Sequence, residues 1–488
     1  MKRKNRITLV YPDYRSGIFS TADLPVGLGY VAEALELAGI EYEVVDLNID
    51  SVDGLFSKVN EFRPQFLGVS MMSYRCKETY ELLHDLKHKF PEVRTVVGGP
   101  HVTANQERVL TECPTIDIGV VGEGEVAIIE IVGGSPLSTI KGVLYREGSE
   151  VSFTGTREFI SNLDEITFPT YHGFKLESYG KTMPVNSSRG CPYKCIFCGA
   201  PRILGNKWRK RSAQSMLTEV KYWYEKGYRS FYFSDSNFAV DKTRVRDFCE
   251  AIIKSKLDAS FTSDGLRADH VDPELLKQMR RAGFTQIVFG VESGSNKVLK
   301  NLKKGETREQ IESTIATATD LEFHVTLFFL IGSPGEDAED IKQSFQLAQK
   351  YDVDEVYFFN LTPIPQTEFY DWAVKQGFLD ECGVRYPEGN FGFSKRAILR
   401  TDVMTIDQIT RWIKKARHIE RQIQWRYELR KLLQRGTKKK AHTNNWLFNT
   451  LTWYISYPVL TGLFGYLFRL TIKSGVFTVH VARKFKIP

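Results

Sequence analysis

The chain has 488 residues, of which 42% are hydrophobic and 26% are charged, and its formal net charge is +7. This length predicts two or three domains, and the balanced composition excludes a disordered protein. The positive excess lies in residues 411–488, where Lys and Arg outnumber Asp and Glu by 17 to 2. The remainder is therefore mildly acidic, which argues against a nucleic-acid enzyme, because such enzymes carry basic residues around their clefts.

Residues 1–133 alternate short apolar strands with amphipathic helices. We expect a helix over residues 25–39 and strands over 6–12, 42–48, 66–72, 95–101 and 118–125. This pattern predicts a parallel, doubly wound, Rossmann-like α/β sheet, which binds ligands at the carboxyl ends of its strands. The candidate ligand-binding residues at those ends are Tyr11, Pro12, Ser70, Ser73, Gly98, Gly99, Gly122 and Glu123.

A second β/α series follows a linker that we place at residues 134–182. Its expected strands span 184–190, 230–237, 259–265, 286–294, 324–336 and 355–367. Six parallel strands joined by helices predict a partial (β/α)6 barrel of the TIM type over residues 183–395. Barrels of this kind carry their active sites at the carboxyl ends of the strands, where polar residues and glycines gather in this sequence.

Three of the seven cysteines, Cys191, Cys195 and Cys198, form a C-x3-C-x2-C motif. A zinc site would want four ligands, and no second cysteine pair follows. Three thiolates can hold three irons of a cubane cluster and leave the fourth iron open for a ligand. The alternative is a structural three-cysteine loop. The odd cysteine number and the lack of a signal peptide at the amino end predict a reducing, cytoplasmic setting.

At these residues the chain resembles the radical S-adenosylmethionine (SAM) superfamily, over about Met183 to Gln376. Four further motifs carry the resemblance: SDSNF (234–238), DGLRADHV (264–271), GVESGS (290–295) and LFFLIGSPGE (327–336). The resemblance implies a 4Fe–4S cluster on the three cysteines, which cleaves SAM reductively to a 5′-deoxyadenosyl radical. One departure is PIPQT, where relatives usually have Pro-Gly-Thr, and it concerns the loop around Gln366.

The same resemblance assigns roles to single residues. Phe197 would lie beside the adenine, Glu292 would hold the amino-acid or ribose part of SAM, and Arg267 would pair with its carboxylate. The full set of implied cofactor-binding residues is Phe197, Asp235, Asn237, Arg267, Glu292, Ser293, Gly332 and Glu336. Each carboxylate also has a structural reading, Glu292 as part of a capped turn and Glu336 as an acid at a helix amino terminus.

The amino-terminal part resembles the cobalamin-binding domain that precedes the radical domain in a large subclass of the superfamily. The pieces are VYPDY, LPVGLGYVAEALELAG, VVGGPHVT and GVVGEGE, between Ile7 and Ile131. Without a D-x-H-x-x-G motif, the resemblance implies base-off cobalamin with no protein imidazole on cobalt. His101 is a candidate ligand, and a loop histidine with a local hydrogen bond is the stronger reading. A vestigial structural domain remains an alternative, whereas a dinucleotide site is rejected because G-x-G-x-x-G is absent after the first strand.

Residues 396–488 form a helical, basic and aromatic region. A capping box of Thr405 and Gln408 predicts a helix start. The stretch from Trp446 to Phe468 has no charge and contains five Trp or Tyr residues, and Lys438–Lys440 precede it. These features favour peripheral attachment to the inner face of a membrane, with a helical cap on the barrel as the alternative.

Taken together, these features predict a radical SAM enzyme with cobalamin as a third cofactor. The preferred reaction is cobalamin-dependent C-methylation of an unactivated carbon. The alternatives are an anaerobic oxidative cyclase or rearrangement on a tetrapyrrole or polyprenoid lipid, and a non-catalytic iron–sulfur module. The expected partners are a small-molecule or lipid-like substrate and an electron donor such as flavodoxin or ferredoxin, without nucleic acid.

Overall fold

The computed structural model describes residues 5–12, 23–379 and 395–437, with side chains as far as Lys431. The chain divides into two compact units, residues 1–417 and 418–488. Both β-sheet domains belong to the first unit. The second unit is described only as the continuation of the last helix, α15 (Ile406–Thr437).

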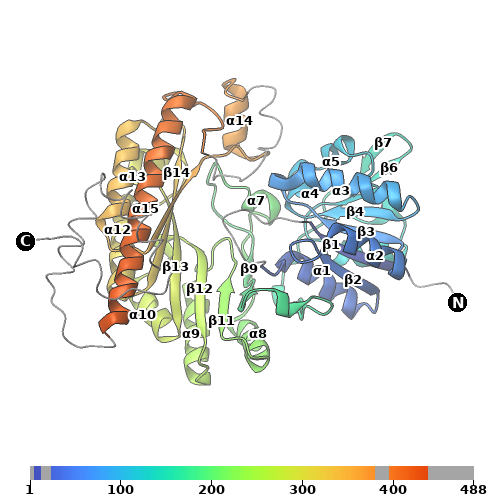
Figure 1. Ribbon diagram of the computed structural model, residues 1–488, viewed down its shortest axis with the longest axis horizontal. Coiled ribbons are helices and arrows are strands. Elements are labelled where there is room, and N and C mark those ends of the chain that lie inside the picture. Colours follow the sequence, from blue (N-terminus) through green and yellow to red (C-terminus); the bar gives the residue numbers. More distant parts are fainter. Residues whose placement is uncertain (1–4, 13–22, 380–394, 438–488) are drawn as a thin grey trace, which may run out of the picture. The chain divides into compact units, whose positions relative to one another are not determined.

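The amino-terminal domain is built on a seven-stranded sheet with the order β2-β1-β3-β4-β5-β6-β7 (Figure 1). Its strands are β1 (Arg6–Tyr11), β2 (Glu41–Asp46), β3 (Phe66–Ser70), β4 (Arg94–Gly98), β5 (Ile118–Val120), β6 (Val143–Glu147) and β7 (Glu150–Phe153). Strands β1 to β5 pair in parallel, which confirms the predicted Rossmann-like sheet. Strands β6 and β7 form an antiparallel hairpin at the edge, inside the segment that we expected to be a linker.

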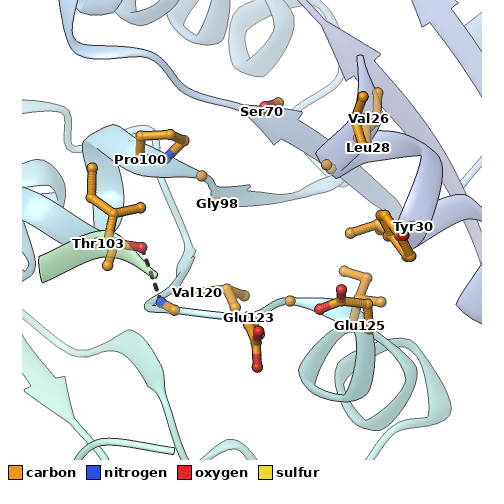
Figure 2. A pocket seen from close by; sticks show the side chains of 18 of the residues that line it. Val26, Leu28, Tyr30, Ser70, Gly98, Pro100, Thr103, Val120, Glu123 and Glu125 are labelled. Carbon is orange, nitrogen blue, oxygen red and sulfur yellow. Dashed lines mark hydrogen bonds between the residues drawn. The ribbon is translucent and has the colours of Figure 1, made fainter. Parts of the chain in front are cut away.

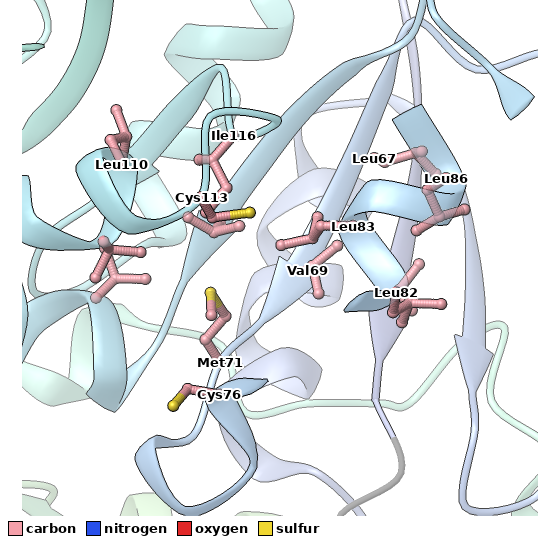
Figure 3. Packing of buried hydrophobic residues seen from close by; sticks show 14 of the residues in the cluster. Leu67, Val69, Met71, Cys76, Leu82, Leu83, Leu86, Leu110, Cys113 and Ile116 are labelled. Atoms are coloured by element: carbon pink, nitrogen blue, oxygen red, sulfur yellow. The ribbon is translucent and has the colours of Figure 1, made fainter. Parts of the chain in front are cut away.

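Helices cover both faces of this sheet and bury a separate apolar cluster on each. One cluster joins the strands to α1 (Val26–Leu37) and α6 (Glu125–Gly133). The other joins them to α2 (Val52–Phe62), α3 (Cys76–Lys89) and α5 (Glu107–Glu112), and in Figure 3 Leu83 of α3 lies against Val69 of β3. A sheet whose strands are buried on both faces explains why the strand sequences read as continuous apolar runs.

The second sheet has six parallel strands in the order β15-β14-β13-β12-β11-β8, which is the predicted partial barrel. Its strands are β8 (Thr182–Val185), β11 (Ser230–Phe233), β12 (Ser260–Leu266), β13 (Phe284–Glu292), β14 (His324–Ile331) and β15 (Glu355–Asn360). The helices of the domain are α8 (Ala213–Glu225), α9 (Lys242–Ser255), α10 (Pro273–Arg281), α11 (Asn296–Asn301), α12 (Arg308–Asp320), α13 (Ala338–Lys350) and α14 (Glu368–Lys375). Neighbouring strands follow one another along the chain, except that β9 and β10 lie between β8 and β11 in sequence. The sheet is open, with one edge at β8 and the other at β15.

A short antiparallel ribbon precedes and follows the cysteine motif. Strand β9 (Ser188–Arg189) pairs with β10 (Arg209–Lys210), and helix α7 (Ala200–Ile203) lies between them in sequence. The ribbon therefore closes the loop that carries the three cysteines. Near the end of the first unit, the predicted capping box is confirmed, because the Gln408 amide nitrogen donates to Thr405 Oγ1 and the Thr405 amide nitrogen to Gln408 Oε1.

In the part of the chain that the structure describes, we find no helix whose length and apolarity would suffice for crossing a bilayer. The uncharged stretch from Trp446 to Phe468 and Lys438–Lys440 lie outside the described residues.

Candidate active site

The three motif cysteines lie on one loop directly after β9 and are free thiols. Burial raises the pKa of Cys195 to about 12, and the neighbouring charge of Cys198 acts in the same direction. Burial also raises the pKa of Cys198, with a contribution from Cys191, so the three sulfur atoms lie within electrostatic reach of one another. Such thiols stay protonated until a metal displaces the proton, and iron binding here would release protons.

The donor set is three thiols on one loop, and cysteine thiolates are the ligands that hold iron–sulfur cubanes. Three thiols on one loop therefore match the predicted cluster, which Cys191, Cys195 and Cys198 would hold.

The backbone around the loop needs glycine at one position. Gly190 adopts a φ of +85°, and a Cβ atom there would lie 2.4 Å from the Lys207 carbonyl oxygen. The next residue is anchored to the same segment, since the Cys191 amide donates to the Gly205 carbonyl at 3.1 Å. Further along, the Ile196 amide donates to Leu302, and Phe197 packs in the apolar cluster around Ile196. The loop is thus fixed on both sides of its central cysteine.

Glu292 ends β13 beside a buried lysine that the sequence did not single out. The Lys304 ammonium lies 3.1 Å from Glu292 Oε1 and 3.3 Å from Glu306 Oε2. Burial opposes the charge of Lys304, but Glu292 and Glu306 keep the pKa of Lys304 above its ordinary value. A Cβ atom on Gly290 would lie 2.8 Å from Glu292 Oε1, so glycine leaves room for this pair. Lys304 also contributes a positive charge at Cys195.

Arg267 is placed near the same group but is already paired. Its Nε and Nη2 donate to the Asp269 carboxylate at 3.0 and 2.9 Å, and its Nη1 donates to the Lys304 carbonyl oxygen at 2.6 Å. The guanidinium also lies over the Tyr193 ring, 3.7 Å from the centroid. These contacts join Arg267 to the backbone at Lys304 and to the loop that carries the cysteines.

The two polar residues after β11 differ in their surroundings. Both Asp235 oxygens accept hydrogen bonds, from Ser187 Oγ at 2.9 Å and from Ser188 Oγ at 2.5 Å. Asp235 therefore holds the segment between β8 and β9 in place. The Asn237 side chain is fully buried, and neither its oxygen nor its nitrogen has a hydrogen-bond partner among the described residues. A buried amide without a partner fits a site that a ligand completes.

Side chains that follow β13 and β14 form hydrogen bonds with backbone amides and stabilise the turns in which they lie. Glu336 Oε2 accepts hydrogen bonds from the Gly332 and Ser333 amides at 2.7 and 3.1 Å. Burial raises the pKa of Glu336 to about 8, although these two amides act in the opposite direction. Ser293 Oγ lies 3.3 Å from Ser344 Oγ and accepts from the Ser295 amide. In the loop that departs from the usual Pro-Gly-Thr, Gln366 has a φ of +63°, the left-handed region that glycine adopts at least cost.

The amino-terminal domain contains a cavity of about 370 Å³ at the carboxyl ends of β3, β4 and β5. Its lining is mostly apolar (Figure 2). Five of the predicted strand-end residues line it: Ser70, Gly98, Gly99, Gly122 and Glu123. Tyr11, Pro12 and Ser73 are not among its lining residues. Small residues at the strand ends let a flat, apolar group approach the backbone.

Two details keep this cavity open. Gly99 has a φ of +99°, and a Cβ atom there would lie 3.0 Å from the Met71 carbonyl oxygen, so the turn requires glycine. The Gly122 amide donates to Thr103 Oγ1 at 3.0 Å, which fixes the turn after β5 (Figure 2). The cavity is thus a built feature of the strand ends.

His101 is buried outside this cavity lining. Its Nε2 lies 3.0 Å from Tyr80 Oη, and its Nδ1 lies 3.1 Å from Ser73 Oγ. Burial lowers the pKa of His101 to about 3, so the ring is neutral at physiological pH. Both ring nitrogens therefore have partners, which agrees with a histidine that serves the local fold.

Comparison with known proteins agrees with this pairing of an apolar sheet cavity and a cysteine loop. A model of the B12 binding domain matches residues 24–132, and a model of the radical SAM superfamily matches residues 185–348. An uncharacterized methyltransferase of Pyrococcus horikoshii is 31% identical over 390 residues, which cover 77% of this chain and 84% of the relative. The chain therefore belongs to the radical SAM superfamily, in the group whose radical domain follows a B12-binding domain.

One further relative and one solved structure are similar to this chain. Cytidylyl-2-hydroxyethylphosphonate methyltransferase of Streptomyces wedmorensis is 28% identical over 422 residues, covering 73% of this chain and 79% of the relative. The fold also matches the methyltransferase TsrM from Kitasatospora setae, solved with cobalamin and a 4Fe–4S cluster, with a TM-score of 0.67 at 19% identity over 76% of this chain and 78% of that chain. The protein is thus a radical SAM enzyme of the cobalamin-dependent methyltransferase family, with SAM, a 4Fe–4S cluster and cobalamin as its cofactors.

The site contains residues that sequence reasoning missed. Lys304 is buried, but it lies in the charged stretch NLKKGE. The composition of that stretch is typical of an exposed surface, and no pattern in it predicts a buried lysine. Arg189 and Glu125 are likewise buried, on either side of the contact between the two domains. Arg189 directly precedes the Gly-Cys of the motif, and that position is the one signal in the sequence that could have drawn attention to it.

Proposed function

We propose that the protein is a C-methyltransferase that adds a methyl group to an unactivated carbon of a small-molecule substrate. When bound, the cluster and SAM supply one-electron chemistry that acid–base side chains cannot perform, and cobalamin carries the methyl group. The observation that supports the proposal is that residues next to the cysteine loop form part of the wall of the apolar cavity. Arg189 and Leu204, which flank the cysteine loop, also line the apolar cavity of the amino-terminal domain.

The residues of the radical domain would bind and orient SAM. Lys304 is suited to the SAM carboxylate. Its ammonium group has three N–H donors, and the structure describes two carboxylates beside it, so one donor would remain for the ligand. Glu292 is suited to the SAM amino group, since its carboxylate is buried next to the cysteine loop. Phe197 and Asn237 would contact the nucleoside part, by apolar packing and by the unpaired amide respectively.

The cavity of the amino-terminal domain would take the aromatic base of the cobalamin nucleotide tail. Its apolar lining and glycine turns suit a flat heterocycle, and His101 is bonded elsewhere. The proposal is therefore base-off cobalamin without a protein imidazole on cobalt. Ser70, Gly98, Gly99, Gly122 and Glu123 would contact the tail.

Product analysis of the reconstituted enzyme tests the reaction. Full-length protein is loaded anaerobically with iron, sulfide and hydroxocobalamin, and it is then given SAM, a low-potential reductant and a small-molecule extract. Methylation consumes two SAM molecules and predicts 5′-deoxyadenosine and S-adenosylhomocysteine in comparable amounts. A cyclase or rearrangement would give 5′-deoxyadenosine without S-adenosylhomocysteine. A non-catalytic iron–sulfur module would give neither, and the methyltransferase relatives favour the first outcome.

The sequence supports two further partners. A one-electron donor of the flavodoxin or ferredoxin type would reduce the cluster. The basic and aromatic residues of the carboxyl-terminal tail, which lie outside the described residues, would attach the protein to the inner membrane face. Partition of the full chain and of a chain lacking residues 436–488 between membrane and aqueous fractions tests this attachment. Equal partition would favour the helical cap instead.

A further inference from the structure

A buried ion-pair network joins the amino-terminal domain to the strand before the cysteine loop. Arg189 Nη1 lies 2.9 Å from Glu123 Oε1, and Arg189 Nη2 lies 2.6 Å from Glu125 Oε1. Arg209 Nη1 approaches the same Glu123 oxygen at 2.7 Å. The four side chains are between 3% and 9% exposed. We call Glu123, Glu125, Arg189 and Arg209 the interdomain network.

Three members of the interdomain network, Glu123, Arg189 and Arg209, make further contacts outside the ion pairs. Glu123 Oε2 accepts from the Ile160 amide at 2.7 Å, and Arg209 donates to the Ile160 carbonyl at 2.7 Å. The Arg189 guanidinium lies 4.7 Å from the Tyr30 ring centroid. Because the pairs are buried, separating them would leave unpaired charge in a low-dielectric setting, so the network has one strongly preferred arrangement.

The network reaches the cysteine loop through a short and stiff segment. Arg189 and Arg209 face each other in the β9–β10 ribbon. Only Gly190 separates Arg189 from Cys191, and a Cβ atom at Gly190 would lie 2.4 Å from the Lys207 carbonyl oxygen and 2.9 Å from the Gly205 carbonyl oxygen, which leaves the segment little room to shift. A displacement of Arg189 therefore moves the backbone of Cys191, and a fixed Cys191 holds Arg189.

The same network forms a charged part of the wall of the apolar cavity. Glu123, Glu125 and Arg189 line the cavity together with Leu204, which follows the cysteine loop on the other side. A ligand that fills the cavity covers these side chains and excludes water from them. Exclusion of water strengthens ion pairs. A ligand in the cavity should therefore favour the paired arrangement of the interdomain network more than an empty cavity does.

We propose that the interdomain network couples the two cofactor sites, so that cobalamin in the cavity and the iron–sulfur cluster on the cysteines tighten each other's binding. Arg189 is a positioning residue in this scheme, because it acts on Cys191 through the backbone. Coupling of this kind is reciprocal, and loading either site changes the affinity of the other by the same factor. The inference rests on the proposed cobalamin and cluster sites, and it concerns binding alone, whichever carbon is methylated.

Titration of the full-length protein with hydroxocobalamin tests the coupling. The dissociation constant is measured anaerobically by equilibrium dialysis, once with the reconstituted cluster and once with cluster-free protein. We expect wild type to bind hydroxocobalamin at least about fivefold more tightly when the cluster is present. Equal dissociation constants in the two wild-type samples would overturn the proposal without any variant.

Two variants, one in the ribbon and one directly after it, separate coupling from general destabilisation. Arg189→Lys keeps the charge but cannot bridge two carboxylates in the planar geometry of arginine, and it should bring the ratio of the two dissociation constants close to one. Arg211→Lys is the matched control, because Arg211 pairs with Glu219 inside the radical domain. The control should keep the wild-type ratio. Equal ratios in the two variants would contradict the assignment to Arg189.

The electron paramagnetic resonance spectrum of the reduced cluster gives a second readout. Hydroxocobalamin should shift the g values of the cluster signal, measured apart from the signal of cob(II)alamin, in wild type and Arg211→Lys, because it fixes the segment before Cys191. It should leave the spectrum of Arg189→Lys unchanged. A spectrum that does not respond to hydroxocobalamin in wild type would contradict the coupling.

Discussion

The Lys304 ammonium lies 3.1 Å from the Glu292 carboxylate, and the two side chains are 7% and 11% exposed. The pair sits at the end of β13 and adds charge to the surroundings of Cys195. A buried pair of opposite charges near Cys195 would offer complementary groups to the amino acid moiety of SAM. The geometry explains why Arg267, which is held by Asp269 and by the Lys304 carbonyl, can serve as a support.

Replacement of Lys304 tests its role as the carboxylate ligand. Lys304→Met removes the charge and leaves Glu292 buried without its ion-pair partner, so we expect the dissociation constant for SAM to rise at least about tenfold. Calorimetric titration of the cluster-loaded protein measures this change, and visible absorbance should show that the cluster is retained. Lys304→Arg should recover part of the affinity.

The neighbouring lysine is a matched control for this experiment. Lys303 pairs with Glu368 at the surface, where the two side chains are 52% and 58% exposed. Exposed pairs contribute little, so Lys303→Met should leave SAM binding unchanged. Similar losses of affinity in Lys303→Met and Lys304→Met would contradict the assigned role.

Filling the apolar cavity should block cobalamin without disturbing the sheet. Gly98 lines the cavity, and the nearest atom to a Cβ there would be 3.8 Å away, so a Cβ atom fits in ordinary van der Waals contact. We expect Gly98→Leu to weaken hydroxocobalamin binding at least about tenfold in a dialysis experiment, because the leucine side chain would occupy part of the proposed site of the cobalamin nucleotide tail. Gly133→Leu, at a position with no atom within 4 Å of a Cβ, should bind normally. Normal binding by Gly98→Leu would show that the tail lies elsewhere.

The stability of the radical domain should depend on the protonation of Glu336. Its pKa is raised by burial from an ordinary value of 4.5 to about 8. Between these values the folded protein keeps a proton that the unfolded chain has lost, so this group lowers stability as the pH rises through that window. Glu336→Gln mimics the neutral acid at every pH. The stability of this variant should therefore fall less than that of wild type as the pH rises.

Thermal unfolding measures this difference. Between about pH 5.5 and 8.5 we expect the Tm of wild type to fall by roughly 3–8 °C more than the Tm of Glu336→Gln. Both proteins can still donate the backbone amides of Gly332 and Ser333 to the side-chain oxygen at residue 336, so the turn is preserved. Parallel pH profiles for the two proteins would mean that Glu336 titrates normally.

The sequence was sufficient to predict the parallel strands of both sheets, because most of them contain a short apolar run that ends at small or polar residues. It did not predict the β6–β7 hairpin. Residues 143–153 contain polar and charged side chains on an edge that is solvated on one side, and such alternation is weak in a short segment. The parallel strands are buried on both faces, and they therefore leave a stronger pattern than an edge hairpin does.

The candidate site was less accessible to sequence reasoning than the fold. The spacing of Cys191, Cys195 and Cys198 is a local property and can be read directly. The pairing of Glu292 with Lys304 depends on how a loop returns to the end of β13, and the engagement of Asp235 by Ser187 and Ser188 depends on the β8–β9 connection. Tertiary contacts decide which of several polar residues remains open to a ligand, and no local pattern encodes that choice.

Reductive cleavage of SAM by the cluster is the most direct test of the central claim. Wild type, the triple variant Cys191→Ala/Cys195→Ala/Cys198→Ala and the control Cys249→Ala are reconstituted with iron and sulfide and then reduced in the presence of SAM. We predict an iron–sulfur chromophore and 5′-deoxyadenosine for wild type and Cys249→Ala, and neither for the triple variant. A triple variant that kept its chromophore and still produced 5′-deoxyadenosine would contradict the account.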